Sequence, residues 1–443
     1  MRSHRYIAAV ALSAAALLTV SACSSDGNGG DSGGGTPGAV PTARGEGKTL
    51  TVWVMTDDYT DETLNAINAK FTEATGAKVD LQIQQWEGIT TKISTALSTS
   101  GTPDVLDLGN TQVPGFAANG GLLDLSQYKD DLKQGRTWLA GLEEPATVDG
   151  ALYAVPGFAG ARAVIYNKKT WAAAGVTAAP TTYTELTAAL DKIKAKNPAA
   201  DFSPFYMPGQ YWYAGLQFLW DAGGEIATNE GGNWKGGFSS PAGQKGLTEF
   251  KTFQNTYSTE ASRTLDTDSP DQVQLFADGK TSAILASGGA VGLIQKTNPN
   301  IKSEDIGTFP LPGVSGKNQP VMLGGSVWGI ATKSDAQDLA LQWAKIAGSP
   351  EMQDKWVFGK DGWIPNSTEA IQAAEPALKE QQKAFFTAAL SSKATPAAAQ
   401  WPTLEGDKSV NQVFSAVASG AKTPEVAGKE FDAHLGETLA GGK

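Results

Sequence analysis

The chain beyond residue 47 alternates between patterns typical of strands and patterns typical of helices. Residues 48–55 alternate apolar and polar side chains, as a half-buried strand does. Leu64, Ile67 and Phe71 then recur at helical spacing, and Gly76 stands where a helix would end. This segment therefore predicts a strand followed by a helix.

The same order continues along the chain. Residues 79–83 alternate as a second strand, residues 89–97 show helical spacing up to Gly101, and residues 104–108 form a short third strand. A β-α-β-α-β order predicts a parallel sheet with right-handed connections, covered by helices. In such sheets ligands bind beyond the carboxyl ends of the strands. The first site candidates are therefore the segments that follow these strands: Thr56-Asp57-Asp58, Gln85-Trp86 and Gly109-Asn110-Thr111.

A second group of elements begins near Tyr153, and eight aromatic residues fall within 202–220. The predicted strands of this group are residues 162–167, 282–285, 306–311 and 326–331. The predicted helices are residues 169–174, 182–196, 247–253, 272–276 and most of 335–443. We find no internal repeat. About 395 residues are too many for one small core and fit two α/β lobes.

The first 23 residues predict export. A basic start at residues 2–5 precedes an uncharged apolar run, residues 7–20, which is shorter than the roughly 20 residues of a membrane-spanning helix. Residues 20–23 (Val-Ser-Ala-Cys) resemble a bacterial lipobox in which Cys23 receives the lipid. The alternative is an ordinary secretory signal cut near Ala22. We expect a signal peptide at 1–22 and a lipidated, membrane-anchored Cys23.

Residues 24–47 are mostly Gly, Ser, Pro, Thr and Asp, without an aromatic residue. Such a segment buries too little apolar surface to order itself, so we expect a flexible tether over 23–47. No later stretch is apolar enough to span a membrane. The sequence therefore predicts a folded body held at the extracellular face of the membrane only by its lipid.

Charge and composition narrow the function. Without the signal peptide the chain keeps 33 basic against 46 acidic residues, a net charge near −13. This acidity argues against nucleic acid as a partner. Cys23 is the sole cysteine, and His434 is the one histidine that remains after processing. Triad catalysis and histidine-based zinc sites are therefore excluded, and we expect no cofactor.

Several short segments, taken in order, resemble the family of extracellular solute-binding proteins that feed sugar ABC importers. No single segment is specific, whereas their order over residues 48–370 is. The earlier segments are Leu50-Thr-Val-Trp53, Phe71-Thr-Glu-Ala-Thr-Gly76, Gly101-Thr-Pro-Asp-Val105, Tyr153-Ala-Val-Pro156, Tyr166-Asn-Lys168 and Pro180-Thr-Thr-Tyr-Thr-Glu185. The later ones are Phe276-Ala-Asp-Gly-Lys280, Leu311-Pro-Gly313 and Leu323-Gly-Gly-Ser326. Residues 205–213 also resemble members that bind N,N′-diacetylchitobiose.

This resemblance implies a periplasmic-binding-protein-like fold, with a mainly parallel sheet flanked by helices in each lobe and a hinge between the lobes. It places the first lobe at 48–157 plus 306–352 and the second at 163–305 plus 353–443. The hinge would be residues 158–162, with the chain near Asp305. It further implies a monomer that closes on its ligand and delivers it to ABC permease subunits.

A sugar receptor needs flat aromatic side chains for the ring faces and polar groups for the hydroxyls. Trp86 at a strand end is expected to stack on sugar, or else to lie at a core edge. Asp57 and Asn110 are polar candidates whose ordinary roles would be helix capping and turns. Arg162 is expected at the ligand, or else in an ion pair between the lobes.

The remaining candidates lie later in the chain. Tyr211 and Trp212 belong to a run of three aromatics beside a turn, and at least one of the three should face the cleft. Trp363 is expected at the cleft edge by resemblance. Glycine-containing turns after strands allow close approach to a ligand, although ordinary tight turns would use them too. These turns contribute Ser287, Gly288, Gly325 and Ser326.

Three other functions compete with an oligosaccharide receptor. A lipid-anchored glycoside hydrolase would use two carboxylates, but no pair is marked by its sequence surroundings. A structural or adhesive surface lipoprotein would bind no small ligand, and the two-lobed α/β body argues against it. The third is a receptor for a non-sugar solute; a charged solute would need a dense cluster of Arg or Lys near the cleft, which the sequence does not show. The sequence therefore favours capture of a di- or trisaccharide, such as chitobiose or a similar β-linked sugar, without catalysis.

Overall fold

A six-stranded sheet forms the first lobe of the computed structural model, which describes residues 38–99 and 101–441. In the order β14-β6-β13-β3-β1-β2, its strands are β1 (Thr49–Met55), β2 (Lys78–Gln84), β3 (Val105–Gly109), β6 (Ala154–Gly160), β13 (Gly324–Ile330) and β14 (Ile364–Pro365). Strand β1 pairs in parallel with both β2 and β3, as the sequence predicts. Strand β13 is antiparallel to β3 and β6, and β14 is antiparallel to β6.

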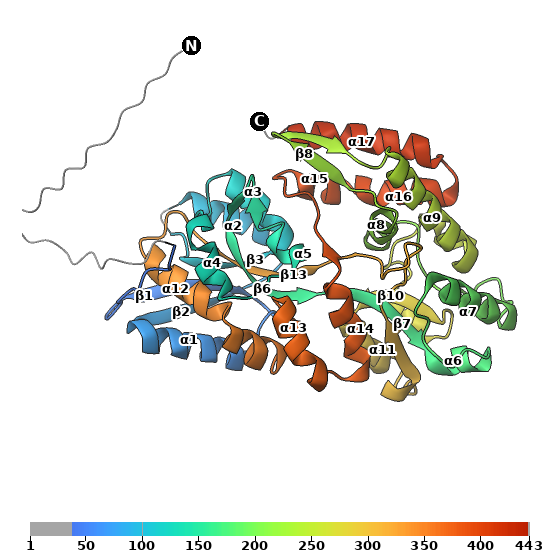
Figure 1. The fold of residues 1–443 in the computed structure, drawn as a ribbon, viewed down its shortest axis with the longest axis horizontal. Helices are drawn as coiled ribbons and strands as arrows, with labels where there is room; N and C mark the ends of the chain where they lie inside the picture. The colour runs from blue at the N-terminus through green and yellow to red at the C-terminus, as the bar shows by residue number, and fades with distance from the viewer. Residues whose placement is uncertain (1–37, 100, 442–443) are drawn as a thin grey trace, which may run out of the picture. The chain divides into compact units, whose positions relative to one another are not determined.

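Helices cover this sheet and cap its strands (Figure 1). They are α1 (Asp61–Thr75), α2 (Ile89–Ser98), α3 (Val113–Ala118), α4 (Lys129–Lys133), α5 (Ala140–Glu143), α12 (Gln337–Ala347), the π-helix η5 (Met352–Phe358) and α13 (Thr368–Ala374). Shorter elements are the turns η1 (Asn110–Gln112), η2 (Ser126–Tyr128) and η6 (Glu375–Ala377) and the hairpin β4 (Thr147–Val148) with β5 (Ala151–Leu152). Helix α1 ends at Gly76, whose φ of 76° favours glycine.

The second lobe is built on a three-stranded sheet in the order β10-β7-β11. Strand β7 (Arg162–Asn167) lies between β10 (Ala283–Ser287) and β11 (Ile306–Phe309) and is antiparallel to both. The two-lobed α/β architecture is confirmed, but the expectation of a mainly parallel sheet in each lobe is wrong for this one. The direction of pairing depends on distant partners, which local periodicity does not reveal.

Helices also surround the second sheet, with α8, α9, α16 and α17 packed together (Figure 1). The helices are α6 (Lys168–Ala173), α7 (Tyr183–Lys196), α8 (Trp212–Asp221), α9 (Pro241–Tyr257), α10 (Gln272–Ala277), α11 (Gly289–Thr297), α14 (Glu380–Ala389), α15 (Trp401–Gly406), α16 (Ser409–Ser419) and α17 (Pro424–Ala440). Shorter elements are η3 (Glu260–Thr264), η4 (Ser303–Asp305), the hairpin β8 (Ala227–Glu230) with β9 (Asn233–Gly236), and the pair β12 (Val321–Met322) with β15 (Ser392–Lys393). Phe218, Phe250 and Phe414 meet edge to face in the core.

The chain crosses between the two sheets at places that shift the expected lobe boundaries. The first crossing joins β6 to β7 through Ala161, inside the expected hinge. The return crossing follows β11, because residues 306–309 pair with β7 and not with the first sheet. It therefore lies between Phe309 and Gly324, not near Asp305. Residues 353–365 also stay with the first lobe, since Val357 packs in its core and β14 joins its sheet. With these shifts, the division into lobes remains our proposal.

The segment that precedes β1 is ordered against the first lobe. Val40 and Ala43 are buried in its core, and the Val40 N–H donates to the Asp131 carboxylate at 2.7 Å. The expected tether therefore cannot extend to residue 47, because residues 40–43 already pack. Cys23 and the expected signal peptide lie outside the described residues. In the part of the chain that is described, no helix has the length and apolarity needed to cross a membrane.

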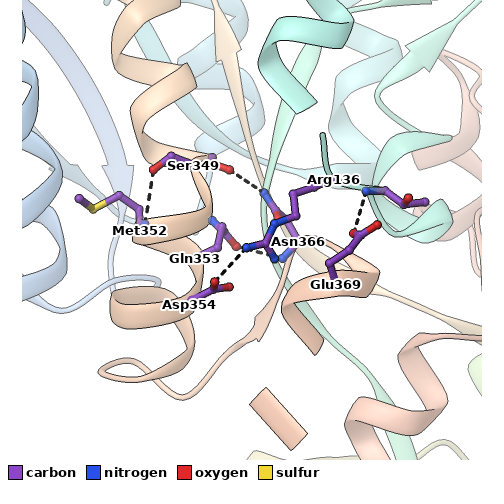
Figure 2. Close-up of polar contacts among 9 residues, drawn as sticks. Arg136, Ser349, Met352, Gln353, Asp354, Asn366 and Glu369 are labelled. Atoms are coloured by element: carbon purple, nitrogen blue, oxygen red, sulfur yellow. Dashed lines mark hydrogen bonds and ion pairs between the residues drawn. The ribbon is translucent and has the colours of Figure 1, made fainter. Parts of the chain in front are cut away.

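Asn366 ties the end of β14 to its surroundings (Figure 2). Its side-chain amide donates to the carbonyls of Pro156 at 2.9 Å and Gly348 at 3.4 Å. Its backbone N–H donates to Gln353 Oε1 at 2.9 Å. Asn366 is 1% exposed, so these groups would otherwise be buried without partners. The residue therefore anchors the end of β14 within the first lobe, ahead of α13.

We expect Asn366→Ala to lower the free energy of unfolding by about 1–3 kcal/mol, because buried carbonyls lose their donor. Urea unfolding followed by circular dichroism measures this loss. Asn300→Ala removes an exposed asparagine of the same size and should change stability by less than about 0.5 kcal/mol. Equal losses in the two variants would contradict the anchoring role of Asn366.

Candidate ligand site

Two of the predicted residues are exposed at the carboxyl edge of the first sheet. Trp86, just after β2, is 41% exposed, which is unusual for so large an apolar ring. Asp57, just after β1, is exposed and has a φ of 66°, in the left-handed region that non-glycine residues seldom adopt. Asp57 does not cap α1, because that position belongs to Thr60. Asp57 is thus free of the capping role that the sequence left open for it, and Trp86 exposes a large part of its ring.

The neighbouring residue, Asp58, links this edge to the crossing strands. Ser326 Oγ on β13 donates to Asp58 Oδ2 at 2.5 Å, and Trp363 Nε1 donates to the Asp58 carbonyl at 2.7 Å. The Trp363 ring in turn stacks on Phe158 of β6, with ring centroids 4.4 Å apart. The loop after β1 is therefore held directly by Ser326 of β13 and by Trp363, which itself packs on β6.

Asp58 also lies beside a second buried carboxyl, Asp107 of β3. Burial raises the pKa of Asp107 well above its usual range, and the neighbouring Asp58 charge raises it further. Burial likewise raises the pKa of Asp58, while hydrogen bonds from Ser326, Asp107 and Trp86 act in the opposite direction. The wall of the site therefore contains a carboxyl group that keeps its proton to a higher pH than a solvent-exposed aspartic acid does.

Three predicted residues have structural roles in place of ligand contacts. Asn110 is 4% exposed, and its amide donates to the carbonyls of Gly141 and Leu323, each at 3.0 Å. Ser326 is buried with its hydroxyl committed to Asp58. Gly325 allows β13 to approach β6, since an added Cβ would lie 2.1 Å from the Phe158 carbonyl oxygen. These three residues shape the wall from behind it.

A cavity of about 520 Å³ lies at the hinge, between the two lobes. Its walls include the crossing residues 159–161, Trp363 from the first lobe, and Ser287 and Gly288 from the second. Amide and hydroxyl groups border it together with aromatic rings: Gln295, Ser303, Gln381, Gln382, Phe385 and Phe386. The combination of flat apolar rings with donors and acceptors suits a polar solute that has apolar faces.

Aromatic side chains gather beside this cavity at the edge of the second sheet. The Arg162 guanidinium lies 3.5 Å above the centre of the Tyr213 ring, and Trp212 stacks against Tyr213 at 4.0 Å. No carboxylate among the described residues lies within ion-pair distance of Arg162. A cation–π contact thus takes the place of the ion pair weighed from the sequence.

Tyr211 and Trp212, the two aromatics chosen from the sequence, are both buried, whereas Tyr213 is half-buried beneath Arg162. The Tyr211 hydroxyl donates to the Leu285 carbonyl at 2.9 Å inside the lobe. The expectation that one of the three faces the cleft therefore fits Tyr213 best. The cause is the start of α8 at Trp212, since successive residues of a helix point about 100° apart.

Trp401 and Glu405 complete the aromatic group and were not selected from the sequence. Trp401 Nε1 donates to Glu405 Oε1 at 2.6 Å, and the Trp401 ring lies 6.3 Å from that of Trp212. Burial raises the pKa of Glu405, although the bond from Trp401 acts in the opposite direction. These residues follow Arg162 by more than 230 positions, so their proximity has no local sequence signal.

Strand pairing joins the cavity to the aromatic group. Ser287, which borders the cavity, stands directly opposite Arg162 in the register of β10 and β7. Trp363, on the other wall, is bonded to the loop that holds Asp57. The structure thus brings the predicted residues into neighbouring groups. The cavity itself is not bordered by Asp57, Trp86, Tyr211 or Trp212. Within 38–99 and 101–441 we find no cluster of three metal-ligating side chains.

Sequence comparison relates this chain to known binding proteins. The family model for bacterial extracellular solute-binding proteins matches residues 57–354. A diacetylchitobiose-binding protein of Streptomyces coelicolor, DasA, is 34% identical over 99% of both chains. A putative binding protein of Brucella abortus is 26% identical over 56% of this chain and 58% of its own length.

Solved structures share the fold. The sugar-binding protein MalE of Xanthomonas citri is 24% identical, with a TM-score of 0.77 over 89% of this chain and 98% of its own. The maltose-binding protein MalE of Listeria monocytogenes, in complex with maltose, is 18% identical, with a TM-score of 0.76 over 89% and 98%. At these identities the likeness establishes the two-lobed architecture.

We expect Tyr211→Phe to lower the free energy of unfolding by about 1 kcal/mol, because the buried Leu285 carbonyl loses a donor. Tyr206→Phe is the matched control, since the buried Tyr206 hydroxyl has no partner among the described residues and its removal should cost little. Chemical denaturation of both variants tests the difference. A larger loss for Tyr206→Phe would contradict the bonding described for Tyr211.

Proposed function

The chain belongs to the family of bacterial extracellular solute-binding proteins, and on this premise we propose that it captures a β-linked di- or trisaccharide of the N,N′-diacetylchitobiose type. As a member of this family it is a binding protein of an ABC importer and not an enzyme. The observation that carries the sugar class is the full-length similarity to a protein named for binding diacetylchitobiose. The mixed aromatic and amide lining of the hinge cavity supports it.

The proposed site uses residues from both lobes. Trp86 and Trp363 offer rings from the first lobe, and Tyr213 offers one from the second. Asp57 and Arg162 supply an acceptor and a donor for sugar hydroxyls, and the turn Ser287–Gly288 leaves room for the ligand beside the backbone. Stacking of an aromatic ring on a sugar face excludes water from that face, while charged groups at the rim fix its orientation.

Arg162 is well suited to a neutral ligand. Its charge already has a partner in the Tyr213 ring, so it can donate to hydroxyl groups without requiring an anionic solute. Among the described residues, the cationic side chain that borders the cavity itself is Lys379, and the acidic Asp361 borders it too. This sparse and balanced charge favours a sugar over a charged solute.

Closure of the lobes around the crossing strands would bury the ligand. A ligand that contacts both lobes binds the closed form more tightly, so it shifts the population toward closure. Residues 159–161 border the cavity and also join the two sheets, so ligand binding and closure of the lobes both act on them. The permease subunits would then recognise the closed form.

The carboxylate geometry agrees with a receptor. Glycoside hydrolases hold two carboxyl groups roughly 5–10 Å apart, on either side of the bond that they cleave. Asp58 and Asp107 lie within hydrogen-bonding reach of each other and are 8% and 1% exposed. A pair so close and so buried leaves no space for a glycosidic bond between its members.

We further propose that Cys23 is lipidated and holds a monomeric receptor at the extracellular face of the membrane. The lipobox-like sequence and the small polar residues that follow it support this anchor. Because ordered packing begins by Val40, the tether is shorter than the sequence pattern suggests. Metabolic labelling with a fatty acid, compared between the native chain and Cys23→Ser, tests the proposal.

Calorimetric titration with chitobiose, cellobiose, maltose and trehalose tests the sugar class. We expect the tightest binding for chitobiose, with a dissociation constant near or below roughly 1 μM, a range suited to capture followed by release. Labelled oligosaccharide should be recovered intact after incubation. Release of shorter products would overturn the receptor function, and tighter binding of maltose would overturn the β-linked assignment.

Trp86→Ala should weaken binding of the preferred sugar about tenfold, equivalent to about 1.4 kcal/mol, because a stacking surface is lost. Trp234→Ala is the matched control: this half-buried tryptophan lies in the β8–β9 hairpin, outside the proposed site, and its loss should leave affinity unchanged. Titration calorimetry compares the two. An unchanged affinity in Trp86→Ala would remove Trp86 from the site.

A further inference from the structure

The buried carboxyl of Asp107 has one oxygen with a donor and one without. Oδ2 accepts the Met55 N–H at 3.1 Å. Oδ1 has no partner among the described residues, although Asp107 is only 1% exposed. A buried carboxylate oxygen without a donor is costly, so such an atom needs an explanation. The Asp58 carboxyl and the Ser326 hydroxyl both lie within hydrogen-bonding reach of the Asp107 carboxyl, and that hydroxyl already donates to Asp58 Oδ2 at 2.5 Å.

Asp58 is differently placed, because donors already reach it. Ser326 Oγ donates to its Oδ2 at 2.5 Å, and the nearby Trp86 side chain also acts to lower the pKa of Asp58. Its ionised form is therefore satisfied, whereas Asp107 lacks a donor on one side. Two adjacent carboxylates that were both ionised would repel each other strongly at this depth. This asymmetry favours a single proton located on Asp107.

No neighbouring cationic side chain among the described residues neutralises the two carboxyls. The ionisable groups that face the pair are Asp57 on the same loop, Tyr59 at the start of α1, and Asp361, which bonds to Thr60. All of these are acidic. No Lys, Arg or His forms an ion pair with Asp58 or Asp107 among the described residues. Compensation must come from a proton rather than from a cationic side chain.

We propose that Asp107 holds a proton and donates it to the Asp58 carboxylate, and that this shared proton positions the ligand-binding loop. Asp58 is the point at which the loop after β1 attaches to Ser326 of β13 and, through its carbonyl, to Trp363. The same loop presents Asp57, and Trp86 lies beside it. Asp58 and Asp107 are thus positioning residues that act through the wall of the site.

Loss of this proton should loosen the wall. Two facing carboxylates would repel, and the weakest attachment is the loop, because Asp107 is held within a central strand of the first sheet. Movement of the loop would displace Asp57 and release Trp363 from the Asp58 carbonyl. If the cleft binds sugar as proposed above, affinity should then fall as pH rises, by up to about tenfold per pH unit beyond the pKa of the pair.

The free energy of unfolding should also fall as pH rises, as the sugar affinity does. Because burial raises the pKa of Asp107 in the folded protein, the folded state holds a proton that the unfolded state has already released above its ordinary pKa of 3.8. Stability from this group is complete below that value and is lost progressively as pH rises toward the folded pKa. Groups with lowered pKa values give the opposite slope, so the pair must be isolated by substitution.

Asp107→Asn tests the proton without reference to any ligand. The asparagine amide mimics the protonated carboxyl, since its nitrogen can donate to Asp58 while its oxygen accepts the Met55 N–H. Thermal unfolding from pH 5 to 9 should show the native chain losing stability relative to Asp107→Asn as pH rises, by up to about tenfold in the folding equilibrium per pH unit. A difference that does not change with pH would overturn the shared proton.

Asp335→Asn serves as the matched control, because this exposed aspartate lies between β13 and α12, away from the pair. This variant should keep the native pH profile. If instead it removes the pH dependence as Asp107→Asn does, the effect is not specific to the pair and the proposal fails.

Titration with N,N′-diacetylchitobiose across the same pH range then tests the positioning role. We expect the affinity of the native chain to fall with rising pH and that of Asp107→Asn to stay constant. A parallel fall in both would overturn positioning by the proton. Absence of sugar binding at every pH would overturn the proposed function instead, while the unfolding experiment would still report on the carboxyl pair.

Discussion

Strand β13 is the element on which the rest of the structure depends, because its backbone pairs with β3 on one side and with β6 on the other. It joins the parallel strands, which end at the ligand edge, to the strand that crosses into the second lobe. The pairing with β6 shifts register between Ser326 and Val327. Such an irregularity re-aims the neighbouring side chain, and here that side chain is the Ser326 hydroxyl that holds Asp58. A backbone constraint thereby becomes a constraint on the site.

Much of the fold follows from local patterns. The β-α-β-α-β order of the first lobe was predictable because each segment shows its own period, and because Gly76 marks the end of α1 through a conformation that favours glycine. The same holds for β7 and for α7, which starts with a capping box at Thr182. The lobe boundaries were not predictable in this way, since β11 and β13 look alike as isolated strands. Only long-range pairing assigns the first to β7 and the second to β3.

The site residues likewise fall into those that local sequence patterns reveal and those that long-range contacts bring together. Trp86 and Asp57 could be selected because strand ends are visible in the sequence and the ligand edge of a parallel sheet follows from them. The sequence could not rank Tyr211, Trp212 and Tyr213 by exposure, because a single helical residue separates a buried ring from one that is half-buried. Trp401 and Glu405 come from a distant helix, and Asp107 looks like any polar residue in a short strand. Their roles depend on three-dimensional proximity.

The placement of charge distinguishes a receptor from a catalyst in this molecule. A hydrolase would need its carboxylates in the open cleft, with one of them ready to give up a proton to a leaving group. Here Asp107, whose pKa is raised by burial, lies inside a strand and directs its proton toward Asp58 behind the wall, while Glu405, whose pKa burial also raises, is bonded to Trp401. The exposed groups at the ligand edge are a flat ring and an aspartate, while the cation across from them rests on a tyrosine. The proton shared by the two carboxyls thus positions the loop after β1. The exposed surface of that loop can then recognise a neutral solute by stacking and hydrogen bonding.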